Sequence, residues 1–336
     1  MLRRVALLTS VAVAAACGNN GSNPFANSST MKPPSADAVL LFVSGSWDPT
    51  PGKPRELQAL NTDGSKVERL SMCAEASQPC DFLEVAPSPD RTRVIAIRTT
   101  PGAQAGASTL YFMDLSRSVE TVIFQNRRVE SADYSPDGTF ILYSAATGQT
   151  SEEDLFYSQP NGQQEQNLTS TTTFRELDPR VDPFARTAVY AGIDDATGVS
   201  RIYLFAQTPL TSGPATGPAL PGTPYLVGAD ATPCLSPDGT SVAFRRLTAV
   251  GNGGLGTWDL MTVKSDGSAA PQVVATGPLF RGAPDWGTKG LVFVETDAAA
   301  SRSELVLIQA DGTGRTVLRT EDAGFQMGAP RWLPGS

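Results

Sequence analysis

Short apolar stretches alternate with polar turns along most of the chain, and the same order of elements returns several times. The most regular unit is a Ser-Pro-Asp-Gly turn before an alternating apolar strand, as in residues 135–138 followed by 140–143. Proline presets φ at the second turn position, aspartate bonds its own downstream backbone, and glycine accepts positive φ. Each copy therefore predicts a strand, a tight turn and a second strand.

The unit, or a near or degenerate copy of it, occurs six times at a nearly constant spacing of 46 to 54 residues. Aligned on the residue before the serine position, the copies fall at Pro87, Tyr134, Val181, Leu235, Trp286 and Trp332. A second strand pair follows in each repeat, and its first strands are predicted at 56–60, 109–115, 154–158, 201–206, 259–263 and 304–308. Four short antiparallel strands at this period are typical of a β-propeller blade.

The two ends of the repeat region complement each other. The last copy stops after its first strand and turn, whereas the first copy begins at its second strand, residues 39–44. We therefore expect residues 329–333 to pair with 39–44 in one composite blade, which closes the ring and protects its strand edges. The predicted fold is all-β, a six-bladed propeller of four-stranded blades over residues 38–336. The five continuous blades are predicted to start near residues 83, 131, 178, 232 and 283.

The copy at residues 232–239, continued by Val242-Ala243-Phe244, resembles the repeat of the TolB-type propeller family. That repeat reads roughly Pro-x-Trp-Ser-Pro-Asp-Gly-x-x-apolar-Ala-Phe, and the resemblance covers about residues 39–335. It implies the fold strongly and the function weakly, because the motif builds blades in many unrelated proteins. The family's namesake carries an α/β domain before its propeller, for which this chain has no room, so we do not expect that identity.

The N-terminus has the pattern of an export signal. Arg3 and Arg4 precede an apolar run over residues 5–16, which is too short to span a bilayer core of about 30 Å as a helix. This pattern predicts a secretory signal peptide over residues 1–16. The next residue is Cys17, and Ala14-Ala15-Ala16-Cys17 resembles the bacterial lipobox, which implies that Cys17 is lipidated. Ordinary signal cleavage with an incidental Cys17 is the alternative.

Residues 17–37 are polar and rich in Asn, Ser and Pro, which predicts a disordered tether behind the lipidated cysteine. By resemblance to lipoprotein sorting, the lack of Asp at position 18 favours an outer-membrane lipoprotein that faces the periplasm. An exported compartment permits disulfides, so Cys73 and Cys80, in one polar loop, are predicted partners, with two free thiols as the alternative. Cys234 lies in an apolar strand and is expected to be buried and inert.

Charge and composition narrow the function. The 26 Lys and Arg residues stand against 34 Asp and Glu, a net charge of −8 without a basic run, which argues against nucleic-acid binding. The chain has no histidine, so histidine-dependent triads, zinc sites and general bases are excluded. No cofactor, metal site or catalytic residue is predicted, and the membrane is expected to be contacted only through the lipid.

Functional residues are expected where loops or channel-lining side chains meet a ligand. The longer loops are predicted on the face opposite the tight turns, and variable loops on a rigid ring often carry function. Polar residues near the innermost strands form the candidate binding face: Glu84, Asp133, Arg175, Asp178, Arg180, Arg281, Asp285 and Arg331. Mixed Arg and Asp side chains suit a polar ligand or a charged partner segment. Ion pairs between blades and solvated rims are the alternative.

The sequence therefore favours a non-enzymatic binding module of the cell envelope that takes a protein, a peptide or a glycan. The alternative is a carbohydrate-active propeller, of glycoside hydrolase or lyase type, that uses carboxylates.

Overall fold

The computed structural model describes the greater part of the chain. The described residues are 31–46, 55–71, 81–99, 108–146, 152–205, 220, 230–250, 256–297, 302–321 and 325–336. The signal peptide, Cys17, Cys73 and Cys80 lie outside these ranges, so lipidation and the disulfide remain predictions. Within the described ranges every regular element is a strand, and no helix has the length and apolarity needed to cross a membrane.

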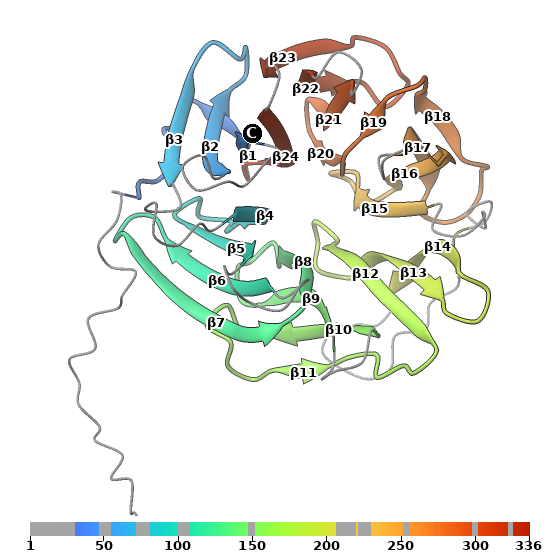
Figure 1. The fold of residues 1–336 in the computed structure, drawn as a ribbon, viewed down its shortest axis with the longest axis horizontal. Coiled ribbons are helices and arrows are strands. Elements are labelled where there is room, and N and C mark those ends of the chain that lie inside the picture. The colour runs from blue at the N-terminus through green and yellow to red at the C-terminus, as the bar shows by residue number, and fades with distance from the viewer. Residues whose placement is uncertain are drawn as a thin grey trace, which may run out of the picture.

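The strands form six antiparallel sheets around a central axis (Figure 1). From the axis outward, blade 1 contains β24 (Phe325–Trp332), β1 (Ala38–Ser46), β2 (Glu56–Asn61) and β3 (Val67–Ser71). Blade 2 contains β4 (Asp81–Pro87), β5 (Arg93–Thr99), β6 (Ser108–Asp114) and β7 (Val119–Arg127). Blade 3 contains β8 (Val129–Tyr134), β9 (Ile141–Ala146), β10 (Glu153–Ser158) and β11 (Gln166–Asn167).

The remaining three blades complete the ring. Blade 4 contains β12 (Phe174–Val181), β13 (Ala188–Asp194) and β14 (Val199–Phe205), beyond which the N–H of Leu220 bonds the Ile202 carbonyl at 2.8 Å. Blade 5 contains β15 (Asp230–Leu235), β16 (Ser241–Ala249), β17 (Thr257–Lys264) and β18 (Gln272–Ala275). Blade 6 contains β19 (Phe280–Arg281) and β20 (Asp285–Gly287) at the axis, then β21 (Gly290–Asp297), β22 (Arg302–Ile308) and β23 (Thr316–Glu321). The predicted six-bladed propeller is confirmed.

The ring closes where the sequence predicts. Strand β24 pairs antiparallel with β1, with Leu40 opposite Trp332 and Leu41 opposite Arg331. The first strand of blade 1 therefore comes from the C-terminal end of the chain and its other three strands from the N-terminal end, so the two ends hold each other in register.

The Ser-Pro-Asp-Gly turns have the chemistry that the sequence suggests. In the turn after β8, Asp137 Oδ1 accepts hydrogen bonds from the Ser135 hydroxyl at 2.6 Å and from the Thr139 N–H at 3.0 Å, and Gly138 has a φ of 71°. These turns and those between the third and fourth strands lie on the same side of the ring, which we call the tight-turn face. The turn aspartates are therefore occupied with local backbone and side-chain bonds.

Three innermost strands carry a bulge in front of a proline. Asp178 in β12, Thr232 in β15 and Ala329 in β24 all have positive φ, of 53°, 49° and 45°, and each precedes a proline. The pairing with the second strand shifts register at each of these positions. Proline cannot donate to the sheet, so it is tolerated in a strand mainly at bulges, and a bulge turns the following side chains to a new direction.

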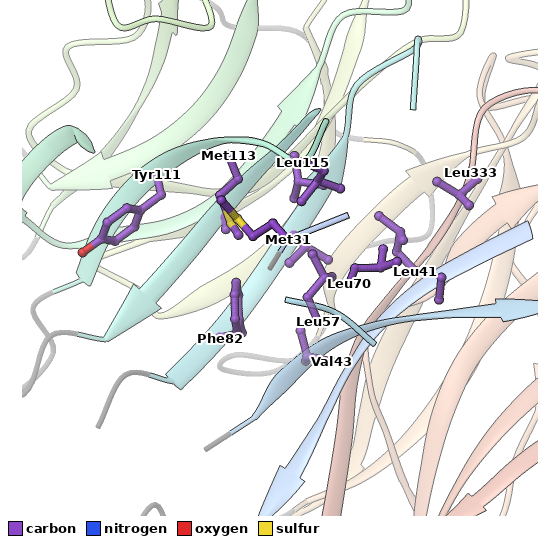
Figure 2. Close-up of a cluster of buried hydrophobic side chains, with 14 of the residues drawn as sticks. Met31, Leu41, Val43, Leu57, Leu70, Phe82, Tyr111, Met113, Leu115 and Leu333 are labelled. Carbon is purple, nitrogen blue, oxygen red and sulfur yellow. The ribbon is translucent and has the colours of Figure 1, made fainter. Parts of the chain in front are cut away.

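Residues 31–37, which the composition assigns to the tether, instead pack against the ring. Figure 2 shows the Met31 side chain among Leu70, Met113 and Leu115, in the cluster of buried side chains between blades 1 and 2. The Lys32 N–H bonds the Leu70 carbonyl at 3.1 Å at the outer edge of blade 1. We call residues 31–37 the strap.

Arg91 fastens the strap to the tight-turn face. It occupies the glycine position of its turn with a φ of 62°, and its Nη2 donates to the carbonyls of Ala38 at 2.6 Å and Ser35 at 3.1 Å. The Ser118 hydroxyl, in the turn between β6 and β7, bonds the Met31 carbonyl at 2.9 Å. The strap therefore crosses the tight-turn face over the junction of the two blades.

Candidate functional site

A cavity of about 420 Å³ opens on the tight-turn face, at the axis of the ring. We call it the funnel. Its rim is formed by the second residue of the turn in each blade except blade 6, where Thr288 replaces the proline: Pro89, Pro136, Pro183, Pro237 and Pro334. Its wall is formed by the last residues of five innermost strands, Pro87, Tyr134, Val181, Leu235 and Trp332, and in blade 6 by Trp286, the middle residue of β20. Both layers are largely apolar.

The floor of the funnel is polar. The preceding residue in each innermost strand supplies it, and around the ring from blade 2 to blade 1 these positions read Ala86, Asp133, Arg180, Cys234, Asp285 and Arg331. All except Ala86 line the cavity. A small residue, an aspartate and an arginine therefore occur twice in succession, so that the two aspartates belong to opposite blades, as do the two arginines.

Each aspartate fastens its own blade to the next. Asp133 Oδ2 accepts a hydrogen bond from the Val181 N–H at 2.9 Å, and Asp285 Oδ2 accepts one from the Trp332 N–H at 2.7 Å. Their other oxygens lie near Arg331 Nη1, at 3.6 Å for Asp133 and 3.9 Å for Asp285. One carboxylate oxygen thus holds the ring together, and the other faces the floor.

Glu84 ties the two arginines together below the floor. Its Oε1 is 2.8 Å from Arg331 Nη2 and 3.1 Å from Arg180 Nη2. Arg331 Nη2 also donates to the Ala132 carbonyl at 3.2 Å. The arginines are therefore held from beneath by a carboxyl that does not line the funnel.

Burial dominates the electrostatics of this cluster. It raises the pKa of Glu84 to about 8, with further upward contributions from Asp178 and Asp133 and an opposing one from Arg180. Burial likewise raises the pKa of Asp285 to about 6, and it raises the pKa of Asp133. The thiol pKa of Cys234 is also raised well above its ordinary value by burial, so at neutral pH the thiol is protonated.

Of the eight residues of the candidate binding face, five meet in this cluster: Glu84, Asp133, Arg180, Asp285 and Arg331. Asp178 lies beside them, and its Oδ2 accepts a bond of 3.1 Å from the Thr232 N–H of the next blade. The other two are engaged elsewhere. Arg175 Nε bonds Glu153 at 2.6 Å, and the buried Arg281 bonds Glu295 at 2.8 Å and the Trp258 carbonyl at 2.7 Å.

The structure adds residues that the sequence reasoning did not select. The apolar wall, with Trp286, Trp332 and Tyr134, coincides with the repeat signature in the sequence, and the hollow lies on the tight-turn face rather than on the face of the longer loops. A usable signal was present, because Pro179, Pro284 and Pro330 each stand directly before a charged floor residue. Among the described residues, no group of three or more Cys, Asp or Glu side chains is arranged to hold a metal ion.

No family model matches the chain, and no curated protein matches it. The chain does match solved structures. The ring is similar to that of TolB. TolB from Acinetobacter baumannii matches with a TM-score of 0.66 and 18% identity, over 90% of this chain and 68% of that one.

Other propellers are similar at comparable or lower levels. A chain of the nidogen/laminin complex matches with a TM-score of 0.60 and 11% identity, over 88% of this chain and 98% of that one. An oligogalacturonate lyase in complex with manganese matches with a TM-score of 0.50 and 13% identity, over 71% of this chain and 68% of that one. At these identities the likeness shows the fold alone, so function has to be argued from the funnel.

Proposed function

We propose that the protein is a non-enzymatic binding module of the bacterial cell envelope, and that its funnel holds a segment of a partner protein or peptide. The observation that carries this proposal is the funnel itself, a cavity of about 420 Å³ with an apolar wall and a charged floor. Ligand sites are typically concave and mostly apolar, with a few convergent polar groups that fix orientation. The exposed Phe184 side chain, 57% accessible and adjacent to the rim residue Pro183, extends the apolar surface outward.

The placement in the envelope is supported by the sequence. The signal-like run before Cys17, the lipobox resemblance and the lack of histidine agree with an exported, lipid-anchored binding protein rather than with a histidine-dependent enzyme. Lipid chains on Cys17 would attach the ring to a membrane without a spanning segment.

Site-specific photo-crosslinking in cells tests the proposal. A photoreactive amino acid at Thr288, on the rim, is expected to give discrete adducts with an envelope protein. The same amino acid at Thr320, exposed on the outer strand β23 of the same blade, serves as the matched control. Equal adduct patterns at both positions, or none at Thr288, would overturn the proposal that the funnel holds a partner.

A second function is favoured by one observation. The inward oxygens of Asp133 and Asp285 lie within about 7.5 Å of each other, because each is within 4 Å of the same Arg331 nitrogen. Glycosidases use paired carboxyls about 5 to 9.5 Å apart, a range that this upper limit overlaps, and the pKa of Asp285, raised to about 6 by burial, suits an acid. Turnover in a panel of glycans that is abolished by Asp133→Asn or Asp285→Asn would establish this function instead.

A further inference from the structure

The polar surface that the floor offers to an occupant is mainly carboxylate. The side chains of Asp133 and Asp285 are 19% and 18% accessible, whereas that of Arg331 is 4% accessible. Arg180 is also deeply buried, at 7%. A ligand that descends the funnel therefore meets mainly the inward oxygens of two aspartates, which lie 3.6 and 3.9 Å from the more deeply buried Arg331 Nη1.

The cluster contains more acidic than basic groups. Because the pKa of Glu84 is raised to about 8, this carboxyl is largely protonated at neutral pH, so Asp133 and Asp285 balance the two arginines and Asp178 adds its charge from the adjacent layer. The raised pKa values of the three carboxyls follow from burial that these two arginines do not fully offset. A third positive charge placed between the aspartates would stabilise their ionised forms.

The buried cations still have unused donors. Arg180, which is buried and lines the funnel, has Nε and Nη1 without a hydrogen-bond partner among the described residues, and the same holds for Arg331 Nε. Buried donors of this kind are costly unless they meet an acceptor oxygen. An occupant that satisfies the groups of the floor must therefore carry both a positive charge and an acceptor oxygen. A basic residue in a polypeptide supplies both.

The wall fits the rest of such a residue. Trp286, Trp332 and Tyr134 form part of an apolar collar above the aspartates. Lys and Arg bury their methylene stems along apolar surface, and aromatic rings attract a cation that lies over their faces. A small neutral polar ligand would gain little from this collar, and an acidic side chain would meet the aspartates first.

We propose that the funnel binds a lysine or arginine side chain presented by a partner's polypeptide segment, with its cationic end between Asp133 and Asp285 and its stem along the tryptophan-lined wall. This inference rests on the proposed function of the funnel as a binding site. The net charge of −8 adds a long-range attraction for basic segments.

Three blocked tripeptides test the inference: acetyl-Gly-Lys-Gly-amide, its Glu counterpart and its norleucine counterpart. The full chain is labelled with 5-fluorotryptophan and followed by fluorine NMR, with resonances assigned through Trp286→Phe and Trp332→Phe. The Lys peptide is expected to shift the Trp286 and Trp332 resonances and to bind at least about tenfold more tightly than the Glu and norleucine peptides. Its affinity is expected to fall as salt is added.

The Asp133→Asn/Asp285→Asn variant is expected to lose at least about tenfold in affinity for the Lys peptide. Asparagine keeps an oxygen to accept the Val181 and Trp332 N–H groups, so this variant retains both blade contacts. Asp266→Asn/Asp311→Asn, which removes the same charge from exposed turns, is the matched control and is expected to bind normally. The salt dependence of Lys-peptide binding to the unmodified chain tests the inference without any variant.

Two results would overturn the inference: binding of the three peptides with equal affinity, or preference for the Glu peptide. In either case adducts at Thr288 would leave the proposed function standing. If the Lys peptide binds as expected but Thr288 gives no adducts in cells, the cation site stands and the proposed protein-binding role fails. If both tests fail, neither the cation site nor the proposed protein-binding role stands.

Discussion

The carboxylate of Asp133 accepts a hydrogen bond of 2.9 Å from the N–H of Val181, and so joins the innermost strands of blades 3 and 4 from inside the channel. In an ordinary sheet, strand pairing connects only neighbours within one blade. This bond connects two blades whose main contact is otherwise side-chain packing, and Asp285 repeats it on the opposite side of the ring.

Asp133→Ala is expected to destabilise the ring. The substitution leaves the Val181 N–H without its acceptor, which costs about 1–3 kcal/mol in the free energy of unfolding. Asp133→Asn keeps an acceptor and removes a buried charge, so we expect it to unfold at a higher urea concentration than the alanine variant. Urea denaturation compares the two variants, and equal midpoints would contradict a structural role for this bond.

Stability is expected to depend on pH through Glu84. Burial raises its pKa to about 8 from 4.5, so the folded protein binds this proton more tightly than the unfolded chain does. The contribution to stability is therefore complete below pH 4.5 and is lost as the pH rises toward and through 8. Glu84→Gln is expected to flatten the decline in the free energy of unfolding between pH 6.5 and 8.5.

Urea titrations at these two pH values measure the effect, since Asp285, with its pKa raised to about 6, has largely titrated below this window. The glutamine keeps an oxygen for the two arginines. An equal decline in the free energy of unfolding of the wild type and the variant would show that Glu84 is not the group that loses a proton in this pH window.

Gly290 is expected to tolerate alanine far less well than Gly335. Both have positive φ, of 128° and 79°, but a Cβ at Gly290 would lie 2.5 Å from the Ile308 carbonyl oxygen, whereas one at Gly335 meets nothing within 4 Å. Gly335→Ala should lose only the backbone cost of about 1–2 kcal/mol. Gly290→Ala adds overpacking of about 1–3 kcal/mol. Thermal unfolding of the two variants gives the comparison, and equal melting temperatures would refute it.

Met31→Ala is expected to loosen the strap. Met31 is 9% accessible and packs between blades 1 and 2, so its truncation should cost about 2 kcal/mol, at the low end for a buried methionine. Hydrogen exchange at the Lys32 amide, which bonds the Leu70 carbonyl, should accelerate. Val273→Ala, at an exposed position of β18, is the control and should change neither stability nor exchange.

Most of the fold can be predicted from the sequence because the hydrogen bonds of its turns join residues that are close in the chain. The Ser-Pro-Asp-Gly turns bond within five residues, so the sequence around Asp137 and Asp238 already contains their partners. The pairing of β24 with β1 is predicted by the incomplete repeats at the two ends of the repeat region, because each repeat lacks the strands that the other contains. Both predictions depend only on pairing and period, which the sequence carries directly.

The funnel was harder to read because its geometry comes from six strands at once. Arg281 occupies an innermost strand like Arg331, yet its partners, Glu295 and the Trp258 carbonyl, lie within blades 5 and 6. The directions of the Arg180 and Arg331 side chains depend on the bulge before each of them, and composition does not show bulges. Composition places the strap in the tether because most of its residues are polar, whereas in the structure the apolar side chain of Met31 packs between blades 1 and 2.

The path of the strap has a geometric consequence. The chain reaches the ring on the tight-turn face, at the junction of blades 1 and 2, which is also the face on which the funnel opens. If Cys17 carries lipid, the stretch from Cys17 to Met31 spans at most about 50 Å even when fully extended. The membrane attachment would then leave the ring on the face where the funnel opens, with Met31 within about 50 Å of the lipid. A segment that lies at the membrane surface, or rises from it, would then be within reach of the funnel.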